Sequence, residues 1–171
     1  MLRTYFDSVK RFKKDRLPIP DGIFEKPLYF IAFGFGVGII PFAPGTFGTL
    51  FAVFLYSLLP TLSFSSHLII TVIITMLSIF ICDKVSREIE LHDHPGMCLD
   101  EFPGFFVSML FAPAGWVGLI SAFLLFRFFD IIKPWPINWI DKNVHGGFGM
   151  VLDDVLAGVY VSVIFLLIAL L

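Results

Sequence analysis

Charged residues divide this chain into long apolar stretches and short polar segments. Residues 28–82, 102–126 and 155–171 contain no Asp, Glu, Lys or Arg. Outside an N-terminal segment, every charge lies in residues 83–101 or 127–154. Apolar runs of this length are compatible with lipid. The pattern therefore predicts membrane-embedded helices, with any chemistry confined to the two polar segments.

The first apolar stretch is predicted to be a hairpin rather than one helix. Glycine and proline crowd its beginning and interrupt helical hydrogen bonding, so we expect irregular backbone over residues 34–46. Irregular backbone cannot face lipid, so this loop should be buried in protein or line a hydrated cavity. Helices are expected over residues 47–59 and 67–82. At ~1.5 Å per residue, both are shorter than a hydrocarbon layer of about 30 Å.

The other two apolar stretches are expected to differ in kind. Residues 103–126 are interrupted by a proline and a glycine at 112–115, which predicts either a kinked span or a second hairpin. Residues 151–171 are long enough to cross a bilayer. If both interrupted stretches are hairpins, the two polar segments reach the same side of the membrane and can share a site. Single crossings would place them on opposite sides.

Composition supports the same fold class. Of 171 residues, 57% are hydrophobic and only 15% charged, whereas an ordinary soluble domain has about a quarter charged residues. We expect an all-α, membrane-embedded helical bundle with interrupted helices and hairpins. A basic N-terminal arm (1–27) would precede a single membrane-embedded domain (28–171). The two cysteines, Cys82 and Cys98, indicate neither a disulfide framework nor a zinc site.

The net charge of −2 hides an asymmetry between the arm and the rest of the chain. The arm holds seven Lys and Arg against four Asp and Glu, and the rest holds five against ten. The positive-inside tendency places this arm on the cytoplasmic side. The arm either rests on anionic lipid headgroups or is a solvated tail that only sets topology. We expect a lipid bilayer around the protein, no nucleic-acid partner and no obligatory protein partner.

Carboxylates gather at the edges of the apolar stretches. The four at these edges are Asp100, Glu101, Asp153 and Asp154. A carboxylate at a membrane boundary is costly unless it meets a cation or a basic partner. Ala157 and Gly158 follow the second pair one helical turn later, which would let a neighbouring helix approach closely. The alternatives are exposed interfacial aspartates and, for the first pair, acids that favour the start of a helix.

Two basic residues adjoin another acid in the second polar segment. Arg127, Asp130 and Pro134 are spaced to share one helical face, so Arg127 and Asp130 can pair. Lys133 comes just before the proline that stops the helix. Arg and Lys that converge on a carboxylate suit a site for a phosphate and its metal, and hard oxygen ligands favour Mg²⁺. The residues alone predict a membrane-embedded, Mg²⁺-dependent enzyme that acts on a phosphorylated, lipidic substrate. Residues 143–149, rich in glycine, are expected to form a flexible turn.

Six separated motifs follow one another between about residue 30 and residue 160. They are Gly34-Phe-Gly-x-Gly with Pro44-Gly45-Thr46-Phe-Gly48-Thr49, His92-Asp-His94, Asp100-Glu101-Phe-x-Gly104, Arg127-x2-Asp130-x2-Lys133-Pro-Trp-Pro136, Asp141-x-Asn143-x-His145-Gly-Gly, and Asp153-Asp154-x2-Ala157-Gly158. Together they resemble the phosphatidylglycerophosphatase A family. The resemblance implies Mg²⁺-dependent hydrolysis of the terminal phosphate of phosphatidylglycerophosphate to phosphatidylglycerol and inorganic phosphate. It also implies a protein of the bacterial cytoplasmic (inner) membrane. The predicted hairpins and the cytoplasmic arm make this a multi-pass protein with its active site expected on the cytoplasmic face.

Within that activity, the metal and phosphate sites are assigned by chemistry. The expected Mg²⁺ ligands, direct or through water, are Glu101, Asp130, Asp153 and Asp154, with Asp100 as an alternative to Glu101. The groups expected to bind the phosphate are Arg127, Lys133, the backbone N–H groups of the loop at Gly45 and Thr46, and the Thr46 hydroxyl, with His145 as a further candidate.

The proton-transfer group and the nucleophile each have alternatives. His94 or His92 is the expected general acid or base, and His145 is another candidate. Water activated by Mg²⁺ is the preferred nucleophile, and a covalent intermediate on Asp100 or Asp154 is the alternative.

A different class of function also fits the apolar pattern. A non-enzymatic membrane subunit or a cation-conducting helical bundle would use the same interrupted helices and intramembrane carboxylates. It predicts ion flux and no phosphate release. The fixed positive charges of Arg127 and Lys133 beside the acids argue against it, because a cation pathway gains nothing from them.

Overall fold

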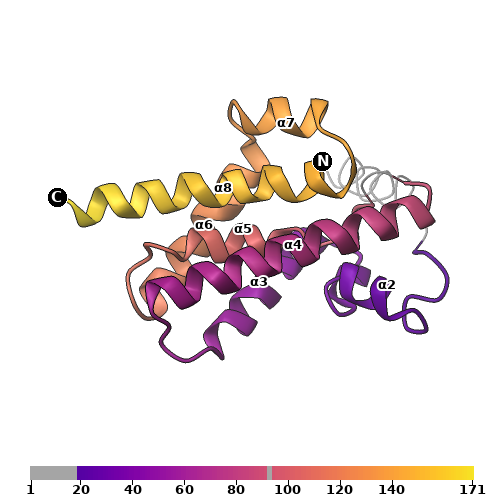
Figure 1. Ribbon diagram of the computed structural model, residues 1–171, viewed down its shortest axis with the longest axis horizontal. Coiled ribbons are helices and arrows are strands. Elements are labelled where there is room, and N and C mark those ends of the chain that lie inside the picture. The colour runs from indigo at the N-terminus through magenta and orange to yellow at the C-terminus, as the bar shows by residue number, and fades with distance from the viewer. Residues whose placement is uncertain (1–18, 92–93) are drawn as a thin grey trace, which may run out of the picture.

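The computed structural model describes residues 19–91 and 94–171, and every regular element in these ranges is helical. In chain order the elements are α2 (Pro27–Ala32), the short 3₁₀ helix η1 (Val37–Ile39), α3 (Pro44–Ser57), α4 (Phe64–Glu88), α5 (Glu101–Ser108), α6 (Trp116–Ile132), α7 (Ile137–Asn143) and α8 (Gly146–Ala169) (Figure 1). The all-α prediction is confirmed. Most of the predicted basic arm, and His92, lie outside the described residues.

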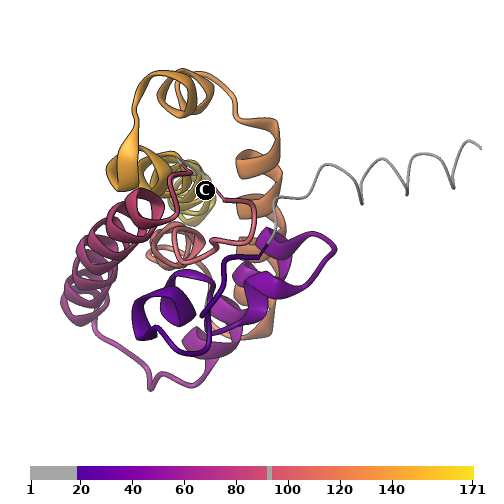
Figure 2. The ribbon, with the colours of Figure 1, turned by 90° about the vertical axis from the view of Figure 1, so that its right-hand side faces the viewer.

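The short helix α5 is the centre of the bundle. It packs against α3, α4, α6 and α8, and Figure 2 shows it enclosed by them when the bundle is viewed end-on. All eight of its residues are buried, as expected for a helix that is apolar on nearly every side. The closest approach is to α8, where a side chain on Gly158 would collide with the Gly104 carbonyl of α5. The predicted close approach of a helix at Gly158 is therefore confirmed.

The chain forms two hairpins, α3–α4 and α5–α6, and both polar segments meet at one end of the bundle. Glu101 at the start of α5 forms an ion pair with Arg127 near the end of α6, at 3.0 Å between Oε2 and Nη1. At the same end, the Gly147 N–H near the start of α8 donates to Asp83 Oδ1 near the end of α4, at 3.1 Å. Both predicted hairpins are present, and they bring the two polar segments to one end of the bundle.

Helix α4 is longer than its sequence pattern predicts. It runs from Phe64 to Glu88, 25 residues or roughly 37 Å, instead of residues 67–82. The prediction ends the helix at the first charged residue, but nothing in residues 83–88 breaks helical hydrogen bonding. Asp83 and Arg87 in fact pair across one turn at 2.9 Å. The expectation that this helix is too short to cross a bilayer is wrong.

Proline sets two other helix boundaries; the first differs from its prediction, and the second, the end of α6, agrees with it. Residues 44–46 form the first turn of α3 rather than part of the irregular loop, since proline is well suited to that position. Turns and η1 do occupy most of residues 34–43, as predicted. The helix α6 stops at Ile132, and Lys133 adopts a left-handed conformation (φ 46°). Pro134 therefore does not share a helical face with Arg127 and Asp130.

Two glycines of the predicted flexible turn at residues 143–149, Gly147 and Gly149, lie in α8 and serve close packing. α8 begins at Gly146, five residues before the predicted start of the last apolar helix. A side chain on Gly147 would collide with the α4 backbone at Ile79 and Asp83. Glycine at this position lets the start of α8 rest directly on α4, and the Asp83 carboxylate caps it.

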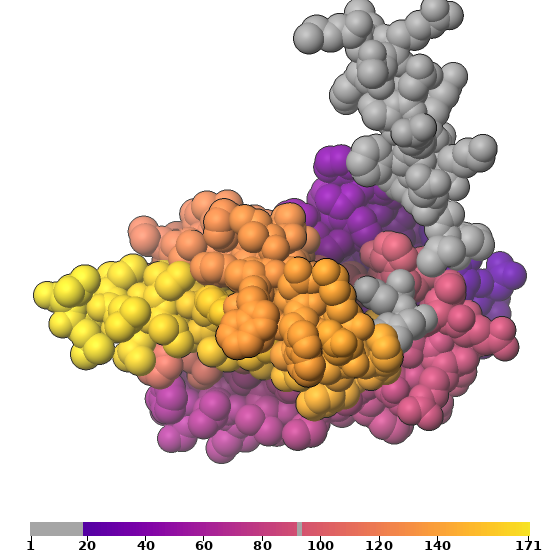
Figure 3. All heavy atoms as spheres, turned by 90° about the horizontal axis from the view of Figure 1, so that it is seen from above, coloured from indigo at the N-terminus to yellow at the C-terminus, as the bar shows by residue number. Residues whose placement is uncertain are grey.

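The two long helices keep large apolar surfaces outside the bundle. The helices α4 and α8, of 25 and 24 residues, are long and apolar enough to cross a membrane. Only 28% of the most apolar 18-residue stretch of α4, and 44% of that of α8, is buried inside the bundle. The exposed side chains include Ile69, Ile73, Met76 and Phe80 of α4 and Val163, Leu167 and Ile168 of α8. Figure 3 shows the C-terminal part of α8 projecting beyond the rest of the bundle. A water-soluble core helix would bury such residues, so the bundle is membrane-embedded.

Candidate active site

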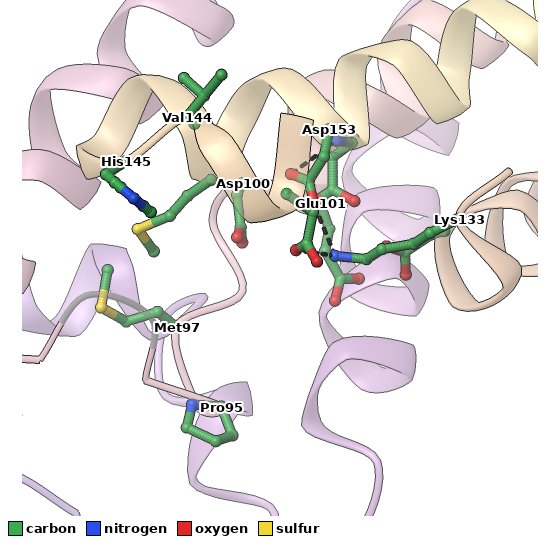
Figure 4. A pocket seen from close by; sticks show the side chains of 13 residues that line it. Pro95, Met97, Asp100, Glu101, Lys133, Val144, His145 and Asp153 are labelled. Atoms are coloured by element: carbon green, nitrogen blue, oxygen red, sulfur yellow. Dashed lines mark hydrogen bonds and ion pairs between the residues drawn. The ribbon is translucent and has the colours of Figure 1, made fainter. Parts of the chain in front are cut away.

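A cavity of about 500 Å³ opens at the end of the bundle where the polar segments meet. Its charged lining consists of Asp100, Glu101, Asp130, Lys133, Asp141, Asp153 and Asp154. Its apolar lining includes Pro95, Met97, Val144 and Met150. Figure 4 shows Glu101, Asp153 and Lys133 on one side, Pro95, Met97, Val144 and His145 on the other, and Asp100 between them. The cavity therefore has a charged half and a largely apolar half.

Helix ends position the acidic side chains. Asp100 is the N-cap residue of α5 and Glu101 its first residue, while Asp130 lies in the last turn of α6. Asp153 and Asp154 lie about two turns into α8 and are buried, at 7% and 4% exposed. With Asp141 of α7, acidic residues from four helices share one cavity.

Arg127 is held by groups of the protein rather than exposed to the cavity. Its Nη1 lies 3.0 Å from Glu101 Oε2 and 2.8 Å from Asp130 Oδ2. The same nitrogen donates to Thr49 Oγ1 of α3 at 3.3 Å, and the Thr49 hydroxyl donates to Glu101 Oε2. Arg127 is not among the residues that line the cavity. Its visible role is to fix two cavity carboxylates, whereas the sequence predicted a phosphate ligand.

Lys133 is the basic side chain that faces the cavity. Its Nζ donates to Asp141 Oδ1 of α7 at 2.5 Å and to Asp153 Oδ2 of α8 at 2.7 Å (Figure 4). Burial alone would lower the pKa of Lys133, but the hydrogen bonds and charges of Asp141 and Asp153 outweigh it and raise that pKa. The ammonium group therefore stays charged, and it is held at the cavity by residues of two helices.

The cavity has more negative than positive charge. Six carboxylates line it, against Lys133 in the lining and Arg127 beside it. Within residues 19–91 and 94–171, no Lys or Arg forms an ion pair with the Asp154 carboxylate, although that side chain is only 4% exposed. Burial also raises the pKa of Glu101 to about 8, although Arg127 and Thr49 partly counteract the shift. Such a charge imbalance favours a cationic ligand.

The donor set suits Mg²⁺ in one particular form. Among the described residues, no three His, Cys, Asp or Glu side chains are arranged to hold a metal ion by themselves. Mg²⁺ rarely uses such cages; it binds one or two carboxylates, keeps several waters and takes further oxygens from a substrate phosphate. Asp154, Glu101 and their carboxylate neighbours fit this mode of binding, in which substrate completes the coordination shell.

The predicted histidines occupy different places. His145 is the N-cap residue of α8 and lines the cavity. His94 is buried outside the lining: its Nδ1 accepts a hydrogen bond from the Gly96 N–H at 3.0 Å, and its ring lies 5.1 Å from that of Phe33. His92 lies outside the described residues. Of the described histidines, His145 is therefore the one at the cavity.

The α3 residues predicted to bind phosphate also lie outside the lining. Gly45 is in the first turn of α3, against Glu101 and Arg127, and neither it nor Thr46 lines the cavity. Two site residues received no role from the sequence, Thr49 and Asp141. Both stand inside conspicuous motifs. The partner of Thr49, Glu101, is 52 residues away in the sequence, and Lys133 contacts Asp141 across the turn between α6 and α7, so the fold is needed to show either contact.

The sequence of this chain is similar to known proteins over most of its length. A sequence model of the family described as Phosphatidylglycerophosphatase A matches residues 30–169. Phosphatidylglycerophosphatase A of Haemophilus influenzae is 40% identical over 140 residues, which cover 81% of this chain and 86% of that protein. Phosphatidylglycerophosphatase A of Escherichia coli is 35% identical over 136 residues, 79% of each chain. No solved structure matches the chain significantly.

A third relative has a different name. A Bacteroides thetaiotaomicron protein with the provisional name phosphatidylinositol-3-phosphatase is 39% identical over 141 residues, 76% of this chain and 86% of that protein. The family model covers nearly all of the described bundle, including every cavity carboxylate. The family predicted from the six motifs is thus confirmed: the chain belongs to the phosphatidylglycerophosphatase A family of phosphatases.

Proposed function

We propose that this protein hydrolyses the terminal phosphate monoester of phosphatidylglycerophosphate to phosphatidylglycerol and inorganic phosphate, with Mg²⁺ as its cofactor. The observation that carries the proposal is a single cavity in which Lys133 lies among six carboxylates from four helices, α5, α6, α7 and α8. One cation for the phosphate and several hard oxygens for a metal are the groups that phosphoryl transfer needs. Family membership supports the phosphatase activity.

Asp154 and Glu101 would hold the Mg²⁺ ion, with Asp100, Asp130 and Asp153 acting directly or through water. When bound, the ion would neutralise phosphate oxygens and lower the pKa of a water molecule, which supplies the nucleophile. Both carboxylates lie in the charged half of the cavity, and Asp154 has no basic partner among the described residues. Asp153, in contrast, is paired with Lys133. Glu101 is paired with Arg127 through its Oε2 oxygen.

The remaining roles belong to Lys133, His145 and the apolar half of the cavity. Lys133 would bind the terminal phosphate oxygens while Asp153 keeps its ammonium group in place. Attack of water on phosphorus breaks the bond to the glycerol oxygen, and that oxygen must gain a proton. His145, at the cavity, is placed to supply it. The glycerol part of the lipid would lie along Met97, Val144 and Met150.

We also propose that the active site faces the cytoplasm. The charged residues described after residue 28 all lie at the site end of the bundle, including Lys84, Arg87 and Lys142, and the opposite end has none. Positive residues concentrate on the cytoplasmic side of membrane proteins. Exposed tryptophans lie at both ends of α6, Trp116 at one and Trp135 just past the other, as is typical of the two membrane interfaces.

Cysteine labelling tests this topology. Ser65→Cys lies at the far end of α4 and Lys142→Cys on α7, and both positions are exposed. A membrane-impermeant maleimide added to intact spheroplasts is expected to label the first and spare the second until the membrane is opened. The native Cys82 and Cys98 are buried and give a low background. Equal labelling of both positions in intact spheroplasts would contradict the topology.

Phosphate release from defined lipids tests the reaction, the substrate and the metal together. The purified protein in mixed micelles should release phosphate from phosphatidylglycerophosphate far faster than from phosphatidic acid or phosphatidylinositol 3-phosphate. Chelation should stop the reaction and Mg²⁺ should restore it. Undiminished release after chelation would contradict the metal role, and a preference for the phosphoinositide would reassign the substrate. Cation flux in vesicles without phosphate release would favour the non-enzymatic alternative.

A further inference from the structure

Thr49 of α3 contacts the acidic site from a position with no access to solvent. Its side chain is 0% exposed and does not line the cavity. Its hydroxyl nevertheless contacts Glu101, which does line the cavity. We propose that Thr49 and Gly45 form a cradle on α3 that positions the Glu101 carboxylate for Mg²⁺. This inference rests on the proposed metal role of Glu101 and assigns these two residues a positioning role instead of substrate contact.

The hydrogen bonds around Thr49 give the hydroxyl a defined orientation. Arg127 Nη1 donates to Thr49 Oγ1 at 3.3 Å, which occupies a lone pair of the hydroxyl oxygen. The single hydroxyl proton can then go to Glu101 Oε2 or to the Gly45 carbonyl oxygen, at 3.1 Å. When Glu101 holds a cation it is ionised, and its carboxylate is then the stronger acceptor. Thr49 and Arg127 therefore both act on Oε2 and leave Oε1 as the oxygen available to a ligand.

Gly45 controls the other oxygen. A side chain at this position would collide with Glu101 Oε1, and the nearest atoms after it belong to the Arg127 guanidinium group. Glycine therefore leaves the room that the carboxylate occupies. Gly45 and Thr49 are one helical turn apart on α3, so the same face of one helix sets the position of both Glu101 oxygens.

A fixed carboxylate matters because a glutamate side chain has three rotatable bonds. Glu101 is the first residue of α5 and is 7% exposed, so α5 alone fixes its backbone but not its terminal oxygens. Groups that orient a metal ligand through a hydrogen bond typically change metal affinity or activity by about 10–100-fold when they are removed. Loss of the Thr49 hydroxyl should therefore weaken metal binding.

Thr49→Val removes the hydroxyl and keeps the shape of the side chain. We expect the Mg²⁺ concentration for half-maximal phosphate release to rise by about tenfold or more. Binding of Mn²⁺ to the substrate-free protein, followed by electron paramagnetic resonance, should weaken by a similar factor. Thr49→Ser, which keeps the hydroxyl, should stay close to the wild type. Gly45→Ala should weaken metal binding as Thr49→Val does, because the methyl group displaces Glu101.

Thr71→Val is the matched control. Thr71 is 3% exposed, and its hydroxyl bonds the carbonyl of His67 one turn earlier in α4 at 2.9 Å, away from the cavity. The same change there should leave both readouts unaltered. If Thr49→Val does not fold, Thr49→Cys replaces it, since a thiol is a much weaker donor than a hydroxyl. The expected order of metal affinity is then wild type, Thr49→Ser, Thr49→Cys.

Two outcomes overturn the cradle, and they differ in what else they overturn. Wild-type protein that neither needs Mg²⁺ nor binds Mn²⁺ would overturn the proposed metal together with the cradle. Metal-dependent wild-type activity, with metal binding unchanged in a folded Thr49→Val or Thr49→Cys, would overturn the cradle alone. Equal weakening in Thr49→Ser and Thr49→Val would also overturn it, because only one of these variants lacks the hydroxyl.

Discussion

Replacing Asp154 with asparagine is expected to reduce phosphate release by at least about a hundredfold. The change removes a charge that helps to bind Mg²⁺, and a bound metal ion stabilises the transition state by several kcal/mol. Asp154 is buried, faces the cavity and has no basic partner among the described residues. Asparagine keeps the size of the side chain and removes an uncompensated buried charge. The bundle should therefore stay folded, and its thermal stability should be equal to or above that of the wild type.

The measurement is phosphate release from phosphatidylglycerophosphate over a range of Mg²⁺ concentrations, together with thermal unfolding in detergent. Glu88→Gln is the matched control, since Glu88 is an exposed carboxylate at the end of α4 and outside the cavity. It should behave like the wild type in both measurements. Unchanged activity with unchanged Mg²⁺ dependence in Asp154→Asn would refute the assignment of this residue.

Lys133→Gln is expected to lower kcat/KM by roughly a hundredfold, the usual effect of removing one group that stabilises developing charge. Of the described residues that line the cavity, Lys133 is the only Lys or Arg. Arg127 is not placed to replace it, because it does not line the cavity and its Nη1 contacts Glu101, Asp130 and Thr49. KM should rise as well as kcat fall, because Lys133 would contact the phosphate in both the bound substrate and the transition state.

Lys142→Gln is the control for this change. Lys142 is an exposed lysine on α7, next in sequence to Asp141, so its replacement removes the same charge near the site without touching the cavity lining. Steady-state kinetics at saturating Mg²⁺ should separate the two variants clearly. If Lys133→Gln and Lys142→Gln had the same modest effect, general attraction of an anionic lipid would explain both, and a direct phosphate contact would be contradicted.

The hairpin architecture and the acidic site could be predicted because membrane folding leaves strong marks in a sequence. Charges are excluded from lipid-facing helices, so their positions at Asp100–Glu101 and Asp153–Asp154 indicated which segments meet at the cavity. Proline and glycine at 112–115 marked the turn between α5 and α6. Signals of this kind depend on neighbouring residues in the sequence and on the surrounding lipid or water, and both are known without the structure.

The parts that could not be predicted depend on contacts between distant segments. A buried Thr49 and a cradling Gly45 have no local signature, since their partners Glu101 and Arg127 lie on other helices. Glycine was also ambiguous: the same residue type allows a turn at Gly36, where φ is 89°, and close helix packing at Gly147. Only the packing of α8 on α4 decides between the two uses.

The exposed apolar faces of α4 and α8 also determine how this enzyme encounters a lipid substrate. A protein held in the bilayer by these faces shares a two-dimensional space with its substrate, so encounters depend on molecules per unit area and not per unit volume. Diluting the substrate lipid with inert lipid, at a constant bulk concentration of substrate, should therefore slow turnover. Adding more vesicles of the same composition should not speed up turnover by enzyme that is already in a membrane. The product lipid remains in the leaflet where it forms, while only the phosphate leaves into water.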